Sequence, residues 1–159
     1  ARIARNDPAN AIADAERVIA TPNASINAYT LFQAYEALSL ALQNAGRLPE
    51  AEQRLTEARE RLPIYRAALT EKIAVVLYQQ GQKAEALREL ESAREASAAE
   101  MIPGSKLVFL RLGMLYAELG RRDEARRDVQ RFLQATSRDR SPITRGYRAE
   151  AEKLLRSLN

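Results

Sequence analysis

The chain has 159 residues and a formal net charge of +4 at pH 7, with a sequence pI of about 9.6. It contains no cysteine and no histidine, which excludes disulfides, thiolate metal sites and catalysis by a histidine base. Hydrophobic residues make up 46%, too many for a disordered chain, and no apolar run approaches the roughly 18 residues of a membrane span.

The N-terminal part predicts one helix near residues 8–21. Its apolar residues follow helical spacing and suit the second helix of a degenerate repeat unit; they are Ala11, Ile12, Ala15, Val18 and Ile19. The chain begins at Ala1 without Met, so we expect a piece of a longer protein. Heavy use of Arg and Ala is typical of GC-rich genomes, so the basic pI by itself says little about function. The compartment, cytoplasm or periplasm, stays open.

One hexamer pattern then occurs three times, at Gly46–Ala51, Gly81–Ala86 and Gly120–Ala125. A glycine just past a helix adopts the left-handed conformation that ends it. Three or four residues later an acidic side chain lies in the first turn of the next helix, where the helix dipole favours it. The small alanine that closes the hexamer allows the two helices to pack closely. Each hexamer therefore predicts the turn of a helix hairpin.

Apolar residues before and after each hexamer recur at three- and four-residue steps, as on one helix face. All six prolines fall at expected helix ends or first turns, where proline is tolerated. The remaining predicted helices are 25–45, 48–62, 64–80, 83–100, 105–119, 122–136 and 142–157. The last one opens at Ser141-Pro142 and carries Tyr147, Ala151, Leu154 and Leu155 on one stripe. No segment has the period of a strand, so the fold class is all-α.

The repeats resemble the tetratricopeptide repeat family. The third unit matches best, and the residues that carry the resemblance there are Leu112, Gly113, Tyr116, Gly120, Ala125 and Phe132. The family's early aromatic position holds Tyr35, Thr70 and Phe109. The resemblance implies one right-handed α-solenoid of antiparallel helix hairpins over residues 1–159. Residues 1–31 would hold the N-terminal helix and the start of the first repeat helix, 32–139 three repeats and 140–159 a capping helix.

Members of this family bind partners in a concave groove lined by the first helix of each repeat. Transferring that register predicts a partner-binding groove of Gln33, Glu36, Leu40, Gln43, Glu71, Lys72, Val75, Tyr78, Leu107, Leu110, Arg111 and Met114. Some members clamp a chaperone's terminal carboxylate with Lys, Asn and Arg. Here those positions hold Glu36, Leu40 and Leu107, and only Arg111 matches, so that activity is not expected.

The third-unit wall of the groove is apolar, and exposed apolar patches often mark interfaces. We therefore expect a partner's apolar side chain to anchor near Leu110 and Met114, with Arg111 pairing a carboxylate beside it. In the alternative, the C-terminal helix or a second copy of the chain already covers this wall.

The stretch from Gly120 to Arg148 holds nine arginines against four acids. Because Asp123, Glu124 and Asp128 are interleaved at helical spacing, a self-paired solvated face is expected, and binding to nucleic acid or an anionic surface is the weaker reading. No nucleophile–base constellation accompanies the acidic residues, so neither enzyme activity nor a cofactor or metal is expected. The sequence thus predicts a scaffold for a protein or peptide partner. The alternative is an oligomerisation or docking appendage of a larger bacterial enzyme or envelope protein, and homo-oligomerisation stays open.

Overall fold

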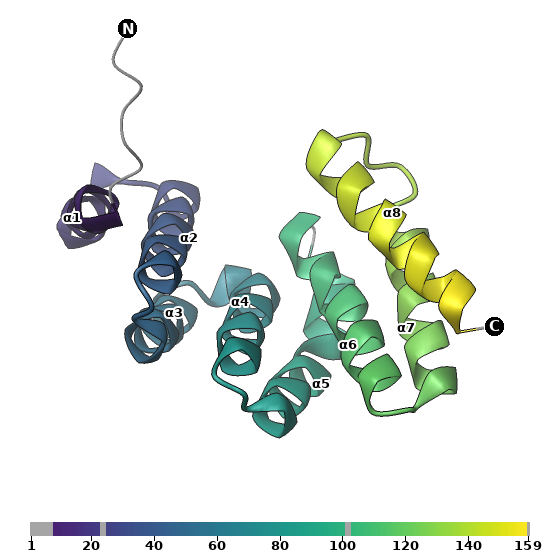
Figure 1. Ribbon diagram of the computed structural model, residues 1–159. Helices are drawn as coiled ribbons and strands as arrows, with labels where there is room; N and C mark the ends of the chain where they lie inside the picture. Colours follow the sequence, from purple (N-terminus) through teal and green to yellow (C-terminus); the bar gives the residue numbers. More distant parts are fainter. Residues whose placement is uncertain (1–7, 23–24, 101–102, 159) are drawn as a thin grey trace, which may run out of the picture.

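The computed structural model describes residues 8–22, 25–100 and 103–158. Within these ranges the chain forms eight α-helices and no strand, and each helix packs against the next (Figure 1). The helices are α1 (Pro8–Ala20), α2 (Ala28–Asn44), α3 (Leu48–Arg61), α4 (Arg66–Gln79), α5 (Lys83–Ala99), α6 (Leu107–Glu118), α7 (Arg122–Ala135) and α8 (Pro142–Ser157). Short 3-10 helices, η2 (Pro63–Tyr65) and η3 (Pro103–Lys106), lead into α4 and α6. The predicted all-α solenoid is confirmed.

The predicted helix ranges agree with these bounds to within a few residues. The largest difference is at α2, which was expected from residue 25 and begins at Ala28. Its start is set by Asn27, whose side chain accepts a hydrogen bond from the backbone N–H of Thr30 at 2.8 Å. An Asn cap of this kind satisfies one of the free N–H groups at a helix start.

The three glycine turns adopt the expected conformation. Gly46, Gly81 and Gly120 have φ of 73°, 82° and 73°, in the left-handed region that glycine adopts at little cost. The next residue's N–H then bonds a carbonyl five positions back, as from Arg47 to Leu42 at 2.9 Å. This pattern ends α2, α4 and α6 in the same way, so the three hairpins share one geometry.

The two helices of a hairpin come close because small residues lie between them. Ala51, Ala86 and Ala125, the alanines that close the hexamers, have no exposed surface. Gly113 of α6 is tighter still: a Cβ there would lie 2.5 Å from Cγ2 of Val129 and 3.2 Å from the carbonyl oxygen of Ala125, both on α7. At this point the α6 backbone packs directly on α7.

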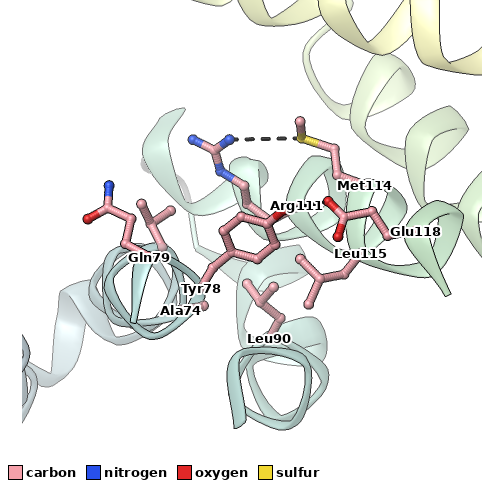
Figure 2. A pocket seen from close by; sticks show the side chains of 9 residues that line it. Ala74, Tyr78, Gln79, Leu90, Arg111, Met114, Leu115 and Glu118 are labelled. Carbon is pink, nitrogen blue, oxygen red and sulfur yellow. Dashed lines mark hydrogen bonds between the residues drawn. The ribbon is translucent and has the colours of Figure 1, made fainter. Parts of the chain in front are cut away.

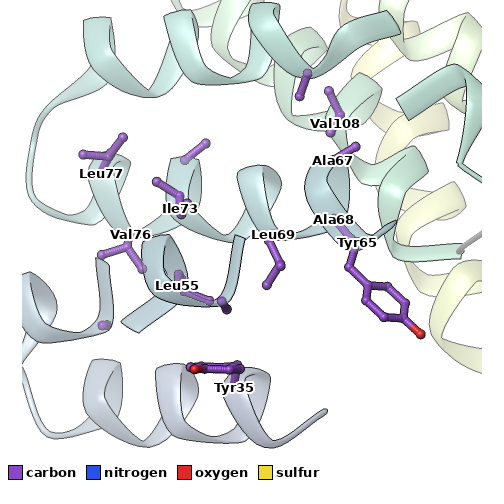
Figure 3. Close-up of a cluster of buried hydrophobic side chains, with 14 of the residues drawn as sticks. Tyr35, Leu55, Tyr65, Ala67, Ala68, Leu69, Ile73, Val76, Leu77 and Val108 are labelled. Atoms are coloured by element: carbon purple, nitrogen blue, oxygen red, sulfur yellow. The ribbon is translucent and has the colours of Figure 1, made fainter. Parts of the chain in front are cut away.

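One continuous hydrophobic core runs through the stacked hairpins. Tyr35, Leu55, Leu69 and Val76 are fully buried in it (Figure 3). The three residues at the early aromatic position, Tyr35, Thr70 and Phe109, are all buried. The position is therefore buried in every unit, although it holds a different side chain in each.

The last helix, α8, covers the apolar end of the stack, as expected of a cap. Ala151 is fully buried in a second cluster with Phe109, Leu110, Val129 and Phe132. On the other side, α8 exposes mostly polar residues, among them Arg145, Glu152, Lys153 and Arg156. A polar outer face is what a solenoid needs where its stacking stops.

The second helices of successive units are joined by ion pairs. Arg54 of α3 lies 2.9 Å from Glu16 of α1, Arg59 of α3 lies 2.6 Å from Glu89 of α5, and Arg94 of α5 lies 2.9 Å from Asp128 of α7. The α1–α3 pair resembles the α3–α5 and α5–α7 pairs. The helix α1 therefore lies where the second helix of a preceding repeat would lie.

The close contact at Gly113 gives a stability prediction. Replacing Gly113 by Ala should lower the free energy of unfolding by about 1–3 kcal/mol, because the new methyl group overpacks against Val129. Gly146 in α8 has no atom within 4 Å of its would-be Cβ, so Gly146→Ala should raise stability by about 0.5–1 kcal/mol. Urea unfolding followed by circular dichroism measures both. Effects of the same sign would contradict the close α6–α7 packing.

A second prediction concerns Tyr35, whose hydroxyl donates to Glu57 at 2.7 Å and accepts from Arg61 at 2.7 Å. Burial, with the hydrogen bond to Glu57, raises the pKa of Tyr35 from 10.0 to about 12. The unfolded chain therefore loses this proton first, and stability should fall as pH rises from 10 to 12. Tyr35→Phe should make that fall shallower in denaturant titrations. An unchanged slope would show that Tyr35 titrates normally in the folded protein.

Candidate functional site

The first helices of the units, α2, α4 and α6, together with α8, line a shared groove. One part of the groove is a hollow of about 330 Å³ that receives residues from all four helices. Its lining is Glu36, Ser39, Leu40, Gln43, Glu71, Lys72, Val75, Leu107, Arg111 and Tyr147. We call this the polar hollow, because charged and amide side chains make up much of its wall.

A second hollow of about 290 Å³ adjoins the first and shares Val75 and Arg111 with it. Figure 2 shows its lining: Ala74, Val75, Tyr78 and Gln79 of α4, Leu90 of α5, and Arg111, Met114, Leu115 and Glu118 of α6. We call this the apolar hollow. On α2, α4 and α6, the residues that line the two hollows recur at steps of three and four positions. They therefore lie on one face of each helix, and the two hollows share that side of the stack.

Most of the residues predicted from repeat register line one of the two hollows; the exceptions are Gln33 and Leu110. Gln33 is exposed on α2, one turn before Glu36. Whether any of these residues contacts a partner stays a prediction. The repeat register did not predict the other lining residues, which are Ser39, Ala74, Gln79, Leu90, Leu115, Glu118 and Tyr147. Treating α8 as the first helix of a further unit would have found Tyr147.

The structure corrects the expectation for Leu110. This side chain has no exposed surface and packs with Phe132 of α7 and Ala151 of α8, so it cannot serve as an exposed anchor. Leu110 still lines, with Met114, a small hollow beside α8, so α8 covers this wall only in part. Met114 remains partly exposed and lies between the apolar hollow and a smaller one of about 220 Å³ beside Leu154 of α8.

Two ion pairs cross the floor of the polar hollow. Lys72 of α4 lies 2.5 Å from Glu36 of α2, and Nε of Arg111 on α6 donates to Glu71 of α4 at 2.8 Å. The guanidinium also lies 5.8 Å from the ring centre of Tyr147 on α8. A chain of charge contacts thus runs from α2 to α8 across the groove.

These pairs keep both cations protonated. Burial lowers the pKa of Lys72, but the carboxylates of Glu71 and Glu36 outweigh it and the pKa is raised. Burial likewise lowers the pKa of Arg111, but the charge of Glu71 and the hydrogen bond to it outweigh burial, so the pKa of Arg111 is raised. Arg111 was expected to be free for a partner's carboxylate. Instead its Nε is bound to Glu71, whose side chain is only 4% exposed, and its Nη1 contacts Met114 Sδ at 3.9 Å (Figure 2).

Tyr78 forms one wall of the apolar hollow and is held by neighbours on two helices. Its hydroxyl donates to Glu118 of α6 at 2.6 Å, and Lys83 at the start of α5 donates to the same carboxylate at 2.8 Å. The Lys83 ammonium also lies 5.1 Å from the Tyr78 ring centre. The ring is therefore fixed before any partner arrives, which lowers the ordering cost of binding.

In the part of the chain that the structure describes, no group of three or more His, Cys, Asp or Glu side chains is arranged to hold a metal ion. None of the described helices is long and apolar enough to cross a membrane.

Comparison with protein families gives one result. A family model described as "Tetratricopeptide repeat" matches residues 33–57, 74–92 and 108–127. These three stretches fall on the hairpins α2–α3, α4–α5 and α6–α7. A comparison with curated proteins finds no match.

The buried position of Glu71 gives a prediction for the groove floor. Arg111→Met should lower the free energy of unfolding by about 3 kcal/mol, because it leaves the Glu71 carboxylate buried and unpaired. Adding Glu71→Met to the same protein should recover much of that loss. The more exposed pair is the control: Lys83→Met should cost less than about 1 kcal/mol. Equal losses for Arg111→Met and Lys83→Met would contradict a structural role for the Glu71–Arg111 pair.

Proposed function

Because the chain carries three tetratricopeptide repeats, we propose that it is a protein–protein interaction scaffold that holds a partner segment across the groove. The observation that carries the proposal is the pair of adjoining hollows on the first-helix face. Repeats of this kind are generally protein-interaction modules. A peptide segment of a partner suits the site better than a small cofactor does. Each hollow is open to solvent, and its volume is near the lower limit of roughly 300 Å³ for pockets that bind small ligands.

The chemistry of the groove indicates what the segment presents. Glu36, Lys72, Glu71 and Arg111 already neutralise one another, so a partner gains little from a charge placed on the groove floor. The apolar hollow instead offers Val75, Tyr78, Met114 and Leu115 to an apolar side chain. Met114 is unbranched and polarizable, which lets the wall adapt to side chains of different shape.

Leu40 provides a second apolar contact at the other end of the groove. It lines the polar hollow and is 59% exposed, so its side chain is accessible to a partner. A segment that reaches from Leu40 to Met114 crosses α2, α4 and α6. It would then contact the first helix of every repeat, through the groove-facing residues of α2, α4 and α6.

The test compares two exposed leucines. Leu40 lies in the groove, and Leu119, 53% exposed, lies at the α6–α7 turn outside both hollows. Leu40→Ala should weaken capture of a partner by about 1–2 kcal/mol if Leu40 is an anchor, and Leu119→Ala should leave it unchanged. Neither change should alter thermal stability much, since both side chains are largely in solvent.

The measurement is quantitative affinity capture with the wild-type chain and each variant, followed by titration calorimetry with the captured protein. Capture that survives Leu40→Ala together with Met114→Ala would overturn the groove proposal. A captured second copy of the chain, dissociated by Leu40→Ala, would favour oligomerisation through the same face. Loss of binding with Leu119→Ala alone would place the interface outside the groove.

A further inference from the structure

The connection between α7 and α8 forms a corner of the molecule with a distinct composition. Arg138 and Arg140 lie in the connection, and Ile143 and Arg145 lie in the first turn of α8. All four side chains are exposed, and Ile143, at 75%, is the most exposed of the large apolar residues in the described chain. Figure 1 shows this connection projecting beyond the α7–α8 packing at the N-terminal end of α8.

The three arginines of this corner have no ion-pair partner within the part of the chain that the structure describes. The acids of α7 pair with other arginines: Asp123 with Arg126, Glu124 with Arg121, and Asp128 with Arg94. Among the described residues, no carboxylate lies within ion-pair distance of Arg138, Arg140 or Arg145. The self-paired face expected from sequence therefore exists along α7 but not at the corner.

Asp139 is the one acid inside the corner, and it is turned onto the start of α8. Its carboxylate accepts from the backbone N–H of Ser141 at 2.9 Å and from the Thr144 hydroxyl at 2.6 Å. The Thr144 hydrogen bond, followed by that of Ser141, lowers the pKa of Asp139. This fixes the backbone that presents Ile143, while the corner keeps an excess of positive charge.

We propose that this α7–α8 corner docks on an anionic lipid surface. Ile143 would enter the boundary between headgroups and acyl chains, and Arg138, Arg140 and Arg145 would contact lipid phosphates around it. An exposed apolar side chain within a few residues of three exposed arginines fits that boundary, where apolar burial and charge attraction act together. The proposal is separate from partner binding in the groove.

The shape and composition of the corner favour a lipid surface over a nucleic acid. Nucleic-acid strands are held in basic grooves with aromatic side chains for base stacking. The corner has no aromatic residue among its exposed side chains, and none of the hollows described above includes a corner residue. A projecting corner with an exposed isoleucine and arginines is instead suited to contact the surface of a lipid bilayer.

The test is co-sedimentation of the protein with vesicles of phosphatidylcholine alone and of an equimolar mixture of phosphatidylcholine and phosphatidylglycerol. Wild type should bind the mixed vesicles and not the neutral ones, and added salt should weaken binding. Replacing Arg140 or Arg145 by Gln should weaken the partition constant by about fivefold each, since each arginine near an anionic surface contributes roughly that factor.

Ile143 has a matched control elsewhere in the chain. Ile64 is 64% exposed, follows Pro63 as Ile143 follows Pro142, and precedes the exposed Arg66 by two residues. Ile143→Ser should lower vesicle binding, whereas Ile64→Ser should not. Thermal unfolding of each variant verifies that the fold is intact, which is expected because all the substituted side chains are exposed.

Three outcomes would overturn the proposal. They are equal binding to neutral and anionic vesicles, equal effects of Ile143→Ser and Ile64→Ser, and unchanged binding after Arg140→Gln with Arg145→Gln. A single-stranded oligonucleotide, followed by fluorescence anisotropy, is the remaining arm. If it binds through these arginines while the anionic vesicles do not, the corner is a nucleic-acid surface instead.

Discussion

The close contact between the two helices of each hairpin is the constraint on which the rest of the structure depends. Ala51, Ala86 and Ala125 are fully buried, and Gly113 brings the α6 backbone onto α7 with no room for a Cβ. Only small residues allow this approach, and the left-handed glycine before each one lets the chain reverse within a few residues. Because the three turns share one geometry, the first helices fall in one row, and a groove can form along them.

Ion pairs then join one unit to the next on both sides of the stack. Arg54, Arg59 and Arg94 pair with carboxylates of neighbouring units along the second helices, and Lys72 and Arg111 do so along the groove floor. In a solenoid each unit contacts only its neighbours, so such pairs bear directly on the angle between units. The groove charges are therefore part of the frame. A partner bound as proposed would meet a surface whose charges are already matched, and its recognition would depend on the apolar hollow and on Leu40.

The sequence predicted what depends on near neighbours in the chain. Helix ends at Gly46 and Gly120, the opening of α8 at Ser141 and the burial of Ala86 follow from local rules, and each is confirmed. The repeat register also predicted which residues of different helices lie on the same side of the stack, because equivalent positions in each repeat face the same way. That is why most of the predicted groove residues line one of the two hollows.

The expectations for Leu110 and Arg111 depended on the distance between helices far apart in sequence. Leu110 has groove register, but α8 packs over it, and nothing in the repeat pattern sets how near α8 lies to α6. Arg111 has the register of a free cation, yet its partner Glu71 is 40 residues away. Local spacing gives the direction in which a side chain points. It does not give what already occupies that place.

The helix α8 links the groove to the proposed lipid-binding corner. Tyr147, which lines the polar hollow, is one turn beyond Ile143 on the same helix. Arg148 fixes this turn by donating to the α7 carbonyl of Leu133 at 2.6 Å and to the hydroxyl of Thr136 at 3.1 Å. The corner and the groove therefore share one rigid element. A chain held at an anionic surface through the corner would present its groove at a fixed angle to that surface, so the two binding events need no conformational change to be linked. Their coupling would be one of placement: the surface would raise the local concentration of a membrane-bound partner segment near the groove.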